Sequence, residues 1–228
     1  MTTPPTAYHA VITGDIVSSG RLPQREFKSV QDVLKRAAEE IRAKLGAQVP
    51  LPLEVFRGDS WQIMVIDPSL ALRVALYLRA YVRAEAPSSS VDTRFAIGVG
   101  TIDTPPERSV GEGRGDAFRV SGELLDRKAS SRMQFGIANG AGDDAREERS
   151  LDVLLHVLDI VVRRWTSAQA HAVRGALLDW KQEKIAETWP GRPITQQAAA
   201  QHLARSGWDG VREAVEYYED VMRTWRPQ

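Results

Sequence analysis

The sequence contains no cysteine. This absence excludes disulfide bonds, thiolate metal sites and cysteine nucleophiles, and it is typical of proteins in a reducing cytosol. The sequence also has no run of about 18 apolar residues, and residues 1–6 lack the basic and apolar regions of a secretory signal. We therefore expect a soluble cytoplasmic protein with no membrane partner.

An excess of charge of one sign is also missing. Lys plus Arg and Asp plus Glu both number 30, so overall charge gives no reason to expect nucleic acid as a partner. The four histidines are scattered and predict no histidine metal cluster. With 228 residues, 43% of them hydrophobic, the chain is long enough for one large domain or a medium and a small one.

Two Gly-Asp pairs mark the most informative stretches. Residues 8–14 form a short apolar run that stops at Gly14-Asp15, which predicts a buried strand with a carboxylate at its end. Residues 51–56 and 61–66 flank Gly58-Asp59, which predicts a β-hairpin with an acid at its tip. Two such carboxylates suit a divalent cation bound to phosphates, although Gly-Asp is also a common turn dipeptide.

The other periodic segments predict an α+β fold. Helices are expected over residues 23–44, 69–86 and 117–128, and strands over 91–102 and 133–138. Gly98 and Gly100 leave one side of the 91–102 strand bare, so that something can approach its backbone closely. The order predicts a ferredoxin-like βαββαβ domain over residues 1–140, with a trailing helix and strand and with the helices on one side of a single sheet.

The rest of the chain predicts a second, all-helical domain. Residues 141–150 are polar and read as a linker, and helices follow over 151–165, 168–189, 195–203 and 209–225. The turn at 206–208 predicts a helix-turn-helix over about 195–225. The candidate DNA-binding residues are Gln196, Gln197, Arg205 and Arg212. Equal numbers of acids and bases after residue 150 leave a helical packing or dimerisation module as the alternative.

Four short segments in order, residues 13–17, 57–62, 95–100 and 115–118, resemble the palm domain of class III nucleotidyl cyclases. The hairpin also resembles the GGDEF diguanylate cyclases, and the whole chain resembles the SatD family of bacterial proteins. The resemblance implies Mg²⁺ or Mn²⁺ held by Asp15, Asp59 and the Ile16 carbonyl, a purine nucleotide or nucleotide-derived signal, and a homodimer. The residues expected to bind the nucleotide are Val17, Ser18, Ser19, Arg57, Gly58, Glu112, Asp116 and Arg119.

The chain departs from the cyclase pattern where catalysis would need it most. Arg119 stands at the position of the ribose-orienting asparagine, and Glu123 at that of the arginine that stabilises the transition state. Val55 stands near the purine-reading lysine. We therefore expect a nucleotide sensor whose helical tail converts occupancy into DNA or partner binding. The alternatives are an active nucleotidyl cyclase or transferase that uses Arg119 or Arg57, and a non-binding dimerisation scaffold.

Overall fold

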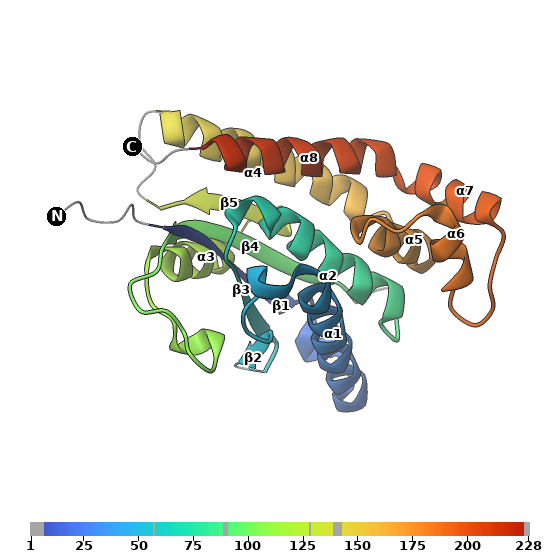
Figure 1. Cartoon of the computed structure of the whole chain (residues 1–228). Helices are drawn as coiled ribbons and strands as arrows, with labels where there is room; N and C mark the ends of the chain where they lie inside the picture. The colour runs from blue at the N-terminus through green and yellow to red at the C-terminus, as the bar shows by residue number, and fades with distance from the viewer. Residues whose placement is uncertain (1–6, 57, 89–90, 128, 139–142, 226–228) are drawn as a thin grey trace.

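The computed structural model describes residues 7–56, 58–88, 91–127, 129–138 and 143–225. These residues form a mixed α/β structure around a five-stranded sheet of order β2-β3-β1-β4-β5, which confirms the expected mixture of helices and strands (Figure 1). The strands are β1 (Tyr8–Ile16), β2 (Glu54–Phe56), β3 (Ser60–Val65), β4 (Thr93–Thr101) and β5 (Met133–Ile137). β1 pairs antiparallel with β3 and with β4, whereas β5 is parallel to β4.

Successive strand residues point to opposite faces of the sheet, and helices cover both of these faces. α1 (Gln24–Leu45) and α2 (Ala71–Glu85) belong to the hydrophobic core on one face. α3 (Asp116–Asp126) packs on the opposite face, mainly against β4, so the expectation of helices on one side was wrong. The reason is Gly98: a Cβ there would lie 2.4 Å from the Ser121 nitrogen, and its absence lets α3 approach the strand.

The C-terminal helices pack on the same core as the sheet. They are α4 (Asp143–Val162), α5 (Ser167–Leu177), α6 (Gln182–Glu187), α7 (Gln196–Ser206) and α8 (Trp208–Thr224). Tyr218 of α8 packs edge-on against Phe135 of β5, with ring centroids 5.6 Å apart. One cluster of buried residues therefore runs from β1 through α2 to α8.

Two sequence boundaries differ in the structure. Residues 143–150, expected within the linker, form the first turns of α4, while 141 and 142 lie outside the described residues. The helix expected over 168–189 is two helices, α5 and α6, because Asp179 adopts a left-handed conformation with φ of 62°. The Arg73 guanidinium donates to the Leu177 carbonyl at 3.2 Å and so satisfies the end of α5.

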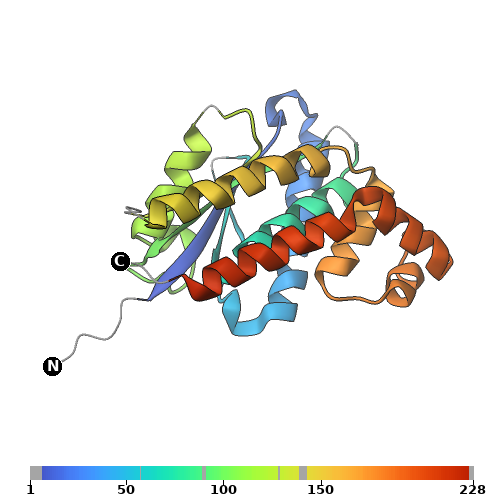
Figure 2. The same ribbon diagram turned by 90° about the horizontal axis from the view of Figure 1, so that it is seen from above.

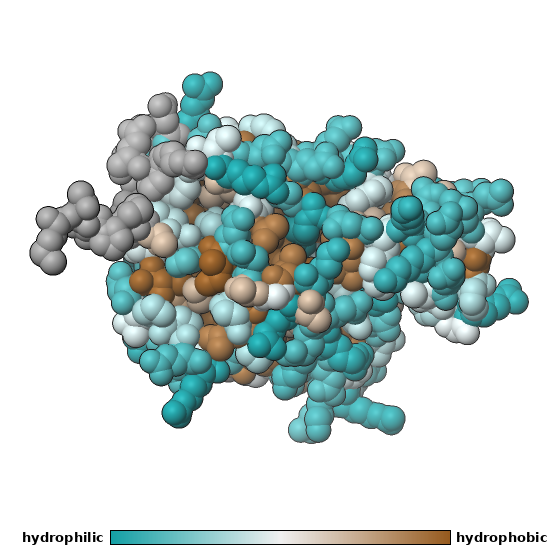
Figure 3. Space-filling model, viewed as in Figure 1, coloured by the Kyte–Doolittle hydropathy of each residue, from teal (hydrophilic) through white to brown (hydrophobic). Residues whose placement is uncertain are grey.

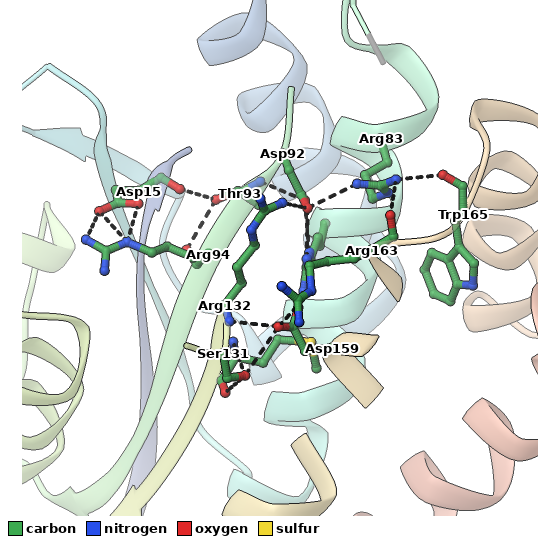
Figure 4. Close-up of polar contacts among 12 residues, drawn as sticks. Asp15, Arg83, Asp92, Thr93, Arg94, Ser131, Arg132, Asp159, Arg163 and Trp165 are labelled. Atoms are coloured by element: carbon green, nitrogen blue, oxygen red, sulfur yellow. Dashed lines mark hydrogen bonds and ion pairs between the residues drawn. The ribbon is translucent and has the colours of Figure 1, made fainter. Parts of the chain in front are cut away.

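A buried ion-pair network joins the sheet to the helical tail (Figure 4). The Arg79 guanidinium of α2 is fully buried and donates to Asp92, just before β4, at 2.8 and 2.9 Å. It also donates to Asp159 of α4 at 2.7 Å. Arg83 and Arg132 add further bonds to Asp92, at 3.0 and 2.7 Å. Burial alone would raise the pKa of Asp92, but these arginines outweigh it and hold the pKa below its ordinary value.

Replacing Arg79 with leucine should lower the free energy of unfolding by about 3–5 kcal/mol, because two buried carboxylates lose their shared partner. Urea denaturation at neutral pH measures this change. Arg119→Leu is the matched control, because Arg119 pairs only on the surface and should change stability little. An Arg79→Leu protein as stable as the wild type would contradict the network's role.

Candidate functional site

Asp15 lies at the end of β1, where it is opposite Ser60 of β3 and Arg94 of β4. Local packing fixes this strand end. The Trp61 ring lies directly over Gly14, where an added Cβ would come within 2.3 Å of it. Thr93 accepts a hydrogen bond from the Trp61 indole at 2.8 Å and donates one to the Asp15 carbonyl at 2.6 Å. The backbone of Asp15 is therefore tied to both neighbouring strands.

Asp59 lies at the tip of the β2–β3 hairpin beside the same strand end. Its carbonyl accepts from the Ile16 amide at 3.2 Å, and its carboxylate accepts from the Ser19 hydroxyl at 2.5 Å. The two acids that the sequence had singled out therefore lie at the same strand end. They share this corner of the sheet with Ile16 and Ser19.

Arg94 is the residue of this corner that sequence reasoning missed. Its guanidinium donates to both carboxylate oxygens of Asp15 at 2.6–2.9 Å (Figure 4). The bonds to Asp15 raise the pKa of Arg94, and the charges of Asp126 and Asp59 add to this effect. Arg94 is therefore within electrostatic reach of both acids. Its side chain is 36% exposed, so it borders solvent, while that of Asp15 is 17% exposed.

The corner offers hard oxygen ligands of the kind that Mg²⁺ and Mn²⁺ prefer, from two carboxylates and backbone carbonyls. Among the described residues no group of three or more His, Asp or Glu side chains is arranged to hold a metal. The donors therefore fit a cation shared with phosphate better than a site made of protein alone. They fit it on one condition: Arg94 must release Asp15, because its guanidinium occupies both carboxylate oxygens.

The loop after β1 is only partly suited to cradle phosphates. The Val17 amide already donates to the Asp92 carbonyl at 2.9 Å. Ser18 is exposed and has a left-handed backbone with φ of 59°, a strain that is common at functional sites. Gly58 also has a positive φ, and its carbonyl accepts from Gln31 of α1. Arg57 lies outside the described residues.

The other expected nucleotide-binding residues lie elsewhere. Asp116 packs beside Gly100, six residues along β4 from Arg94, which is about 20 Å at the rise of a strand. Arg119 pairs with Asp116 at 2.9 Å and with Glu123 at 3.2 Å on the exposed side of α3. Glu112 accepts from the backbone of Arg108 in its own loop. Within one chain these residues do not join the Asp15 corner.

The expected DNA-binding residues of the tail are all exposed. Gln196 and Arg212 line a cavity of about 660 Å³ between α7, α8 and the segment before α6. Arg205 lines a separate groove with Ile160 and Arg164. Only Gly207, in a left-handed conformation, separates α7 from α8, so the turn expected over 206–208 is shorter than the three or four residues usual in DNA-binding motifs.

Comparisons with known proteins give a distant likeness. No family model matches the sequence, and no curated protein matches it. Two solved structures of a bacterial light-regulated adenylyl cyclase are similar at 19% identity. One match covers 58% of this chain and 77% of the other with a TM-score of 0.41; the second covers 59% and 44% with a TM-score of 0.39. At these TM-scores the likeness carries no argument about activity.

No described helix is long and apolar enough to cross a membrane.

Gly14→Ala should lower the free energy of unfolding by about 1–3 kcal/mol, because the new Cβ has no room under the Trp61 ring. Gly20→Ala is the matched control from the same segment: its Cβ would meet nothing within 4 Å. Thermal or urea denaturation of the two variants measures the difference. Equal stability of both variants would show that the strand end tolerates a displaced Trp61.

Proposed function

We propose that the Asp15–Asp59 corner binds the phosphates of a purine nucleotide, or of a nucleotide-derived signal, together with Mg²⁺ or Mn²⁺. The observation that carries the proposal is that Asp15 and Asp59, from separate segments, lie at one exposed strand end, where Arg94 pairs with Asp15 and is close enough to Asp59 to be affected by its charge. A bound Mg²⁺ would neutralise phosphate charge while sharing its oxygen ligands between protein and nucleotide. Ile16, Val17, Ser18, Ser19, Gly58 and Arg57 border this corner in sequence and are its proposed binding residues.

Arg94 is proposed to exchange partners when the ligand binds. In the free protein it neutralises Asp15, so the aspartate can be held in place without a cation. On binding, Asp15 turns its oxygens to the cation and the guanidinium is released toward phosphate, for which its planar fork is well suited. The Asp15–Arg94 ion pair therefore holds Asp15 in place in the free protein. A metal ion that binds without nucleotide would have to break this pair with no phosphate to replace Asp15 as the partner of Arg94.

The proposed role is that of a sensor, because no arginine of α3 is placed to stabilise a transition state. Arg119 is held between two acids, and the turn of α3 that carries it packs beside Gly98, four residues along β4 from Arg94, which is about 13 Å at the rise of a strand. An active nucleotidyl cyclase or transferase is the rival function, and a non-binding dimerisation scaffold is the third. Glu112, Asp116 and Arg119 would contribute only if a second copy supplied them, and a homodimer stays a prediction.

The finer assignments also belong to this proposal. We propose that the strand order β2-β3-β1-β4 is the ferredoxin-like palm arrangement, with β5 added beyond β4, and that the chain is a cytoplasmic member of the SatD family. The tail would convert nucleotide occupancy into DNA or partner binding. The contacts between α4, α8 and the sheet offer a physical route for that coupling.

Titration calorimetry with ATP and GTP, each with Mg²⁺ or Mn²⁺, tests the site. We expect metal-dependent binding of one of these nucleotides, and Asp59→Asn should weaken it more than tenfold because a charged ligand is lost.

Arg94→Gln should act in two directions: tighter binding of Mn²⁺ alone, because Asp15 loses a competing cation, and weaker binding of the nucleotide. Glu187→Gln, an exposed acid of α6, is the control. If neither nucleotide binds, the proposed site is wrong and the non-binding dimerisation scaffold is the function that remains.

A second measurement separates the sensor from the enzyme. Incubation of the protein with each nucleoside triphosphate and Mg²⁺ or Mn²⁺ should release no pyrophosphate, because α3 supplies no free arginine to the Asp15 corner. Release of pyrophosphate that Asp59→Asn abolishes would instead establish the rival, a two-metal nucleotidyl transfer.

DNA binding by the tail is tested by a gel shift with the DNA upstream of the protein's own gene. If the tail recognises DNA specifically, binding should persist between about 50 and 200 mM salt. It should weaken in the double variant Arg205→Ala, Arg212→Ala. The exposed acids Asp209, Glu213 and Glu216 on α8 oppose contact with phosphates. Retention only at the lowest salt would contradict specific recognition and favour a protein partner.

A further inference from the structure

α4 presents both apolar and acidic residues to the sheet: Leu151, Leu155, Leu158 and Val162 are buried in the core. Three of its carboxylates face inward and accept hydrogen bonds from backbone N–H groups along the outer edge of β5 and just before it. The pairs are Glu148 with Ile137 at 2.9 Å, Asp152 with Phe135 at 3.0 Å and Asp159 with Arg132 at 2.9 Å. Because an open strand edge must satisfy these donors, these three acids of α4 are committed to the sheet.

The outward side of α4 is apolar at its centre and basic at its ends. Val153, Val157 and Ile160 are 51%, 56% and 50% exposed, and their spacing of four and three residues places them in one row. Arg149 and Arg164 are exposed beyond either end of this row. Three of the four exposed large hydrophobic residues of the described chain therefore lie on this single helix face.

α8 lies beside α4 and runs in the opposite direction (Figure 2). Hydrogen bonds pin both ends of the pair: the Trp225 indole donates to Asp144 at 2.7 Å, and the Trp165 indole donates to the Ser206 carbonyl at 2.9 Å. The exposed side of α8 carries more acids than bases, and hydrophilic residues cover this helix in Figure 3. Its two exposed arginines, Arg212 and Arg223, pair within the helix with Asp209 at 4.0 Å and with Asp220 at 3.1 Å. Its exposed acids are Asp209, Glu213, Glu216 and Asp220, and the fourth exposed large hydrophobic residue, Tyr217, lies among them.

We propose that a second copy of this chain docks on the surface formed by α4 and α8, with α4 of each copy on α8 of the other. A two-fold axis parallel to the helices would place the basic ends of α4 against the ends of the acidic row: Arg164 near Asp209 and Glu213, and Arg149 near Asp220. The row of Val153, Val157 and Ile160 on one copy then contacts Tyr217 of the other. With the same axis, the alternative of α4 on α4 would bring Arg149 against Arg149 and Arg164 against Arg164, and this repulsion disfavours it.

The size of the surface agrees with a reversible dimer. A helix of 20 residues is about 30 Å long, so two adjacent helices present about 600 Å² per copy. A dimer would bury about 1,200 Å² in total, which is at the lower limit for a specific interface. This association should therefore depend on protein concentration and, because it pairs opposite charges, on salt.

Sedimentation velocity of the full chain from about 1 to 100 µM tests the proposal. We expect a monomer–dimer equilibrium that Val157→Glu weakens more than tenfold. Arg164→Glu and Glu213→Arg should each weaken it, and the two together should restore it. Arg192→Glu, an exposed arginine between α6 and α7, is the matched control. Circular dichroism melts should be unchanged in all variants, because the substituted residues are exposed.

Three results would overturn the proposal. One is a monomer over the whole concentration range. The second is a dimer that Val157→Glu leaves intact, which would place the interface on another surface such as the sheet domain. The third is a charge exchange that fails to restore association, which would show that α4 of one copy does not meet α8 of the other.

Discussion

The buried position of Arg79 is the constraint on which the rest of the structure depends. A fully buried guanidinium is tolerated only when carboxylates satisfy it. Here one carboxylate comes from the sheet region, Asp92 before β4, and the other from the helical tail, Asp159 in α4. Asp92 is followed by Thr93 and Arg94, so the same segment that neutralises Arg79 also positions the partner of Asp15. Core and candidate site are therefore ordered by one short stretch.

The Asp15–Arg94 pair gives the candidate site a different character from a preformed metal centre. An aspartate that is paired with an arginine is held in place without a cation, and in the proposed function it would exchange that partner for a ligand that offers both metal and phosphate. This arrangement suits a site that responds to a complete metal–nucleotide complex. It suits catalysis less well, because the arginine of α3 is committed to Asp116 and Glu123.

Sequence reasoning found the parts of the structure that are determined locally. The apolar run that stops at Gly14-Asp15 and the hairpin around Gly58-Asp59 depend on strand pattern and turn residues, so both could be predicted. Arg94 could not, because its role follows from cross-strand register, which only the folded sheet defines. The same is true of α3: Gly98 and Gly100 indicated a close approach to the strand, but not which segment makes it or on which face. The left-handed Asp179 that divides α5 from α6 has no strong sequence signal, since aspartate is less common there than glycine.

The carboxylates that α4 places along β5 have a consequence for how this protein can be dissected. A chain that ended before α4 would leave the edge of β5 open and Arg79 without Asp159. An unsatisfied strand edge invites intermolecular strand pairing, and an unpaired buried cation destabilises the core beside it. The α/β part should therefore aggregate when it is produced alone, even though its five strands are complete.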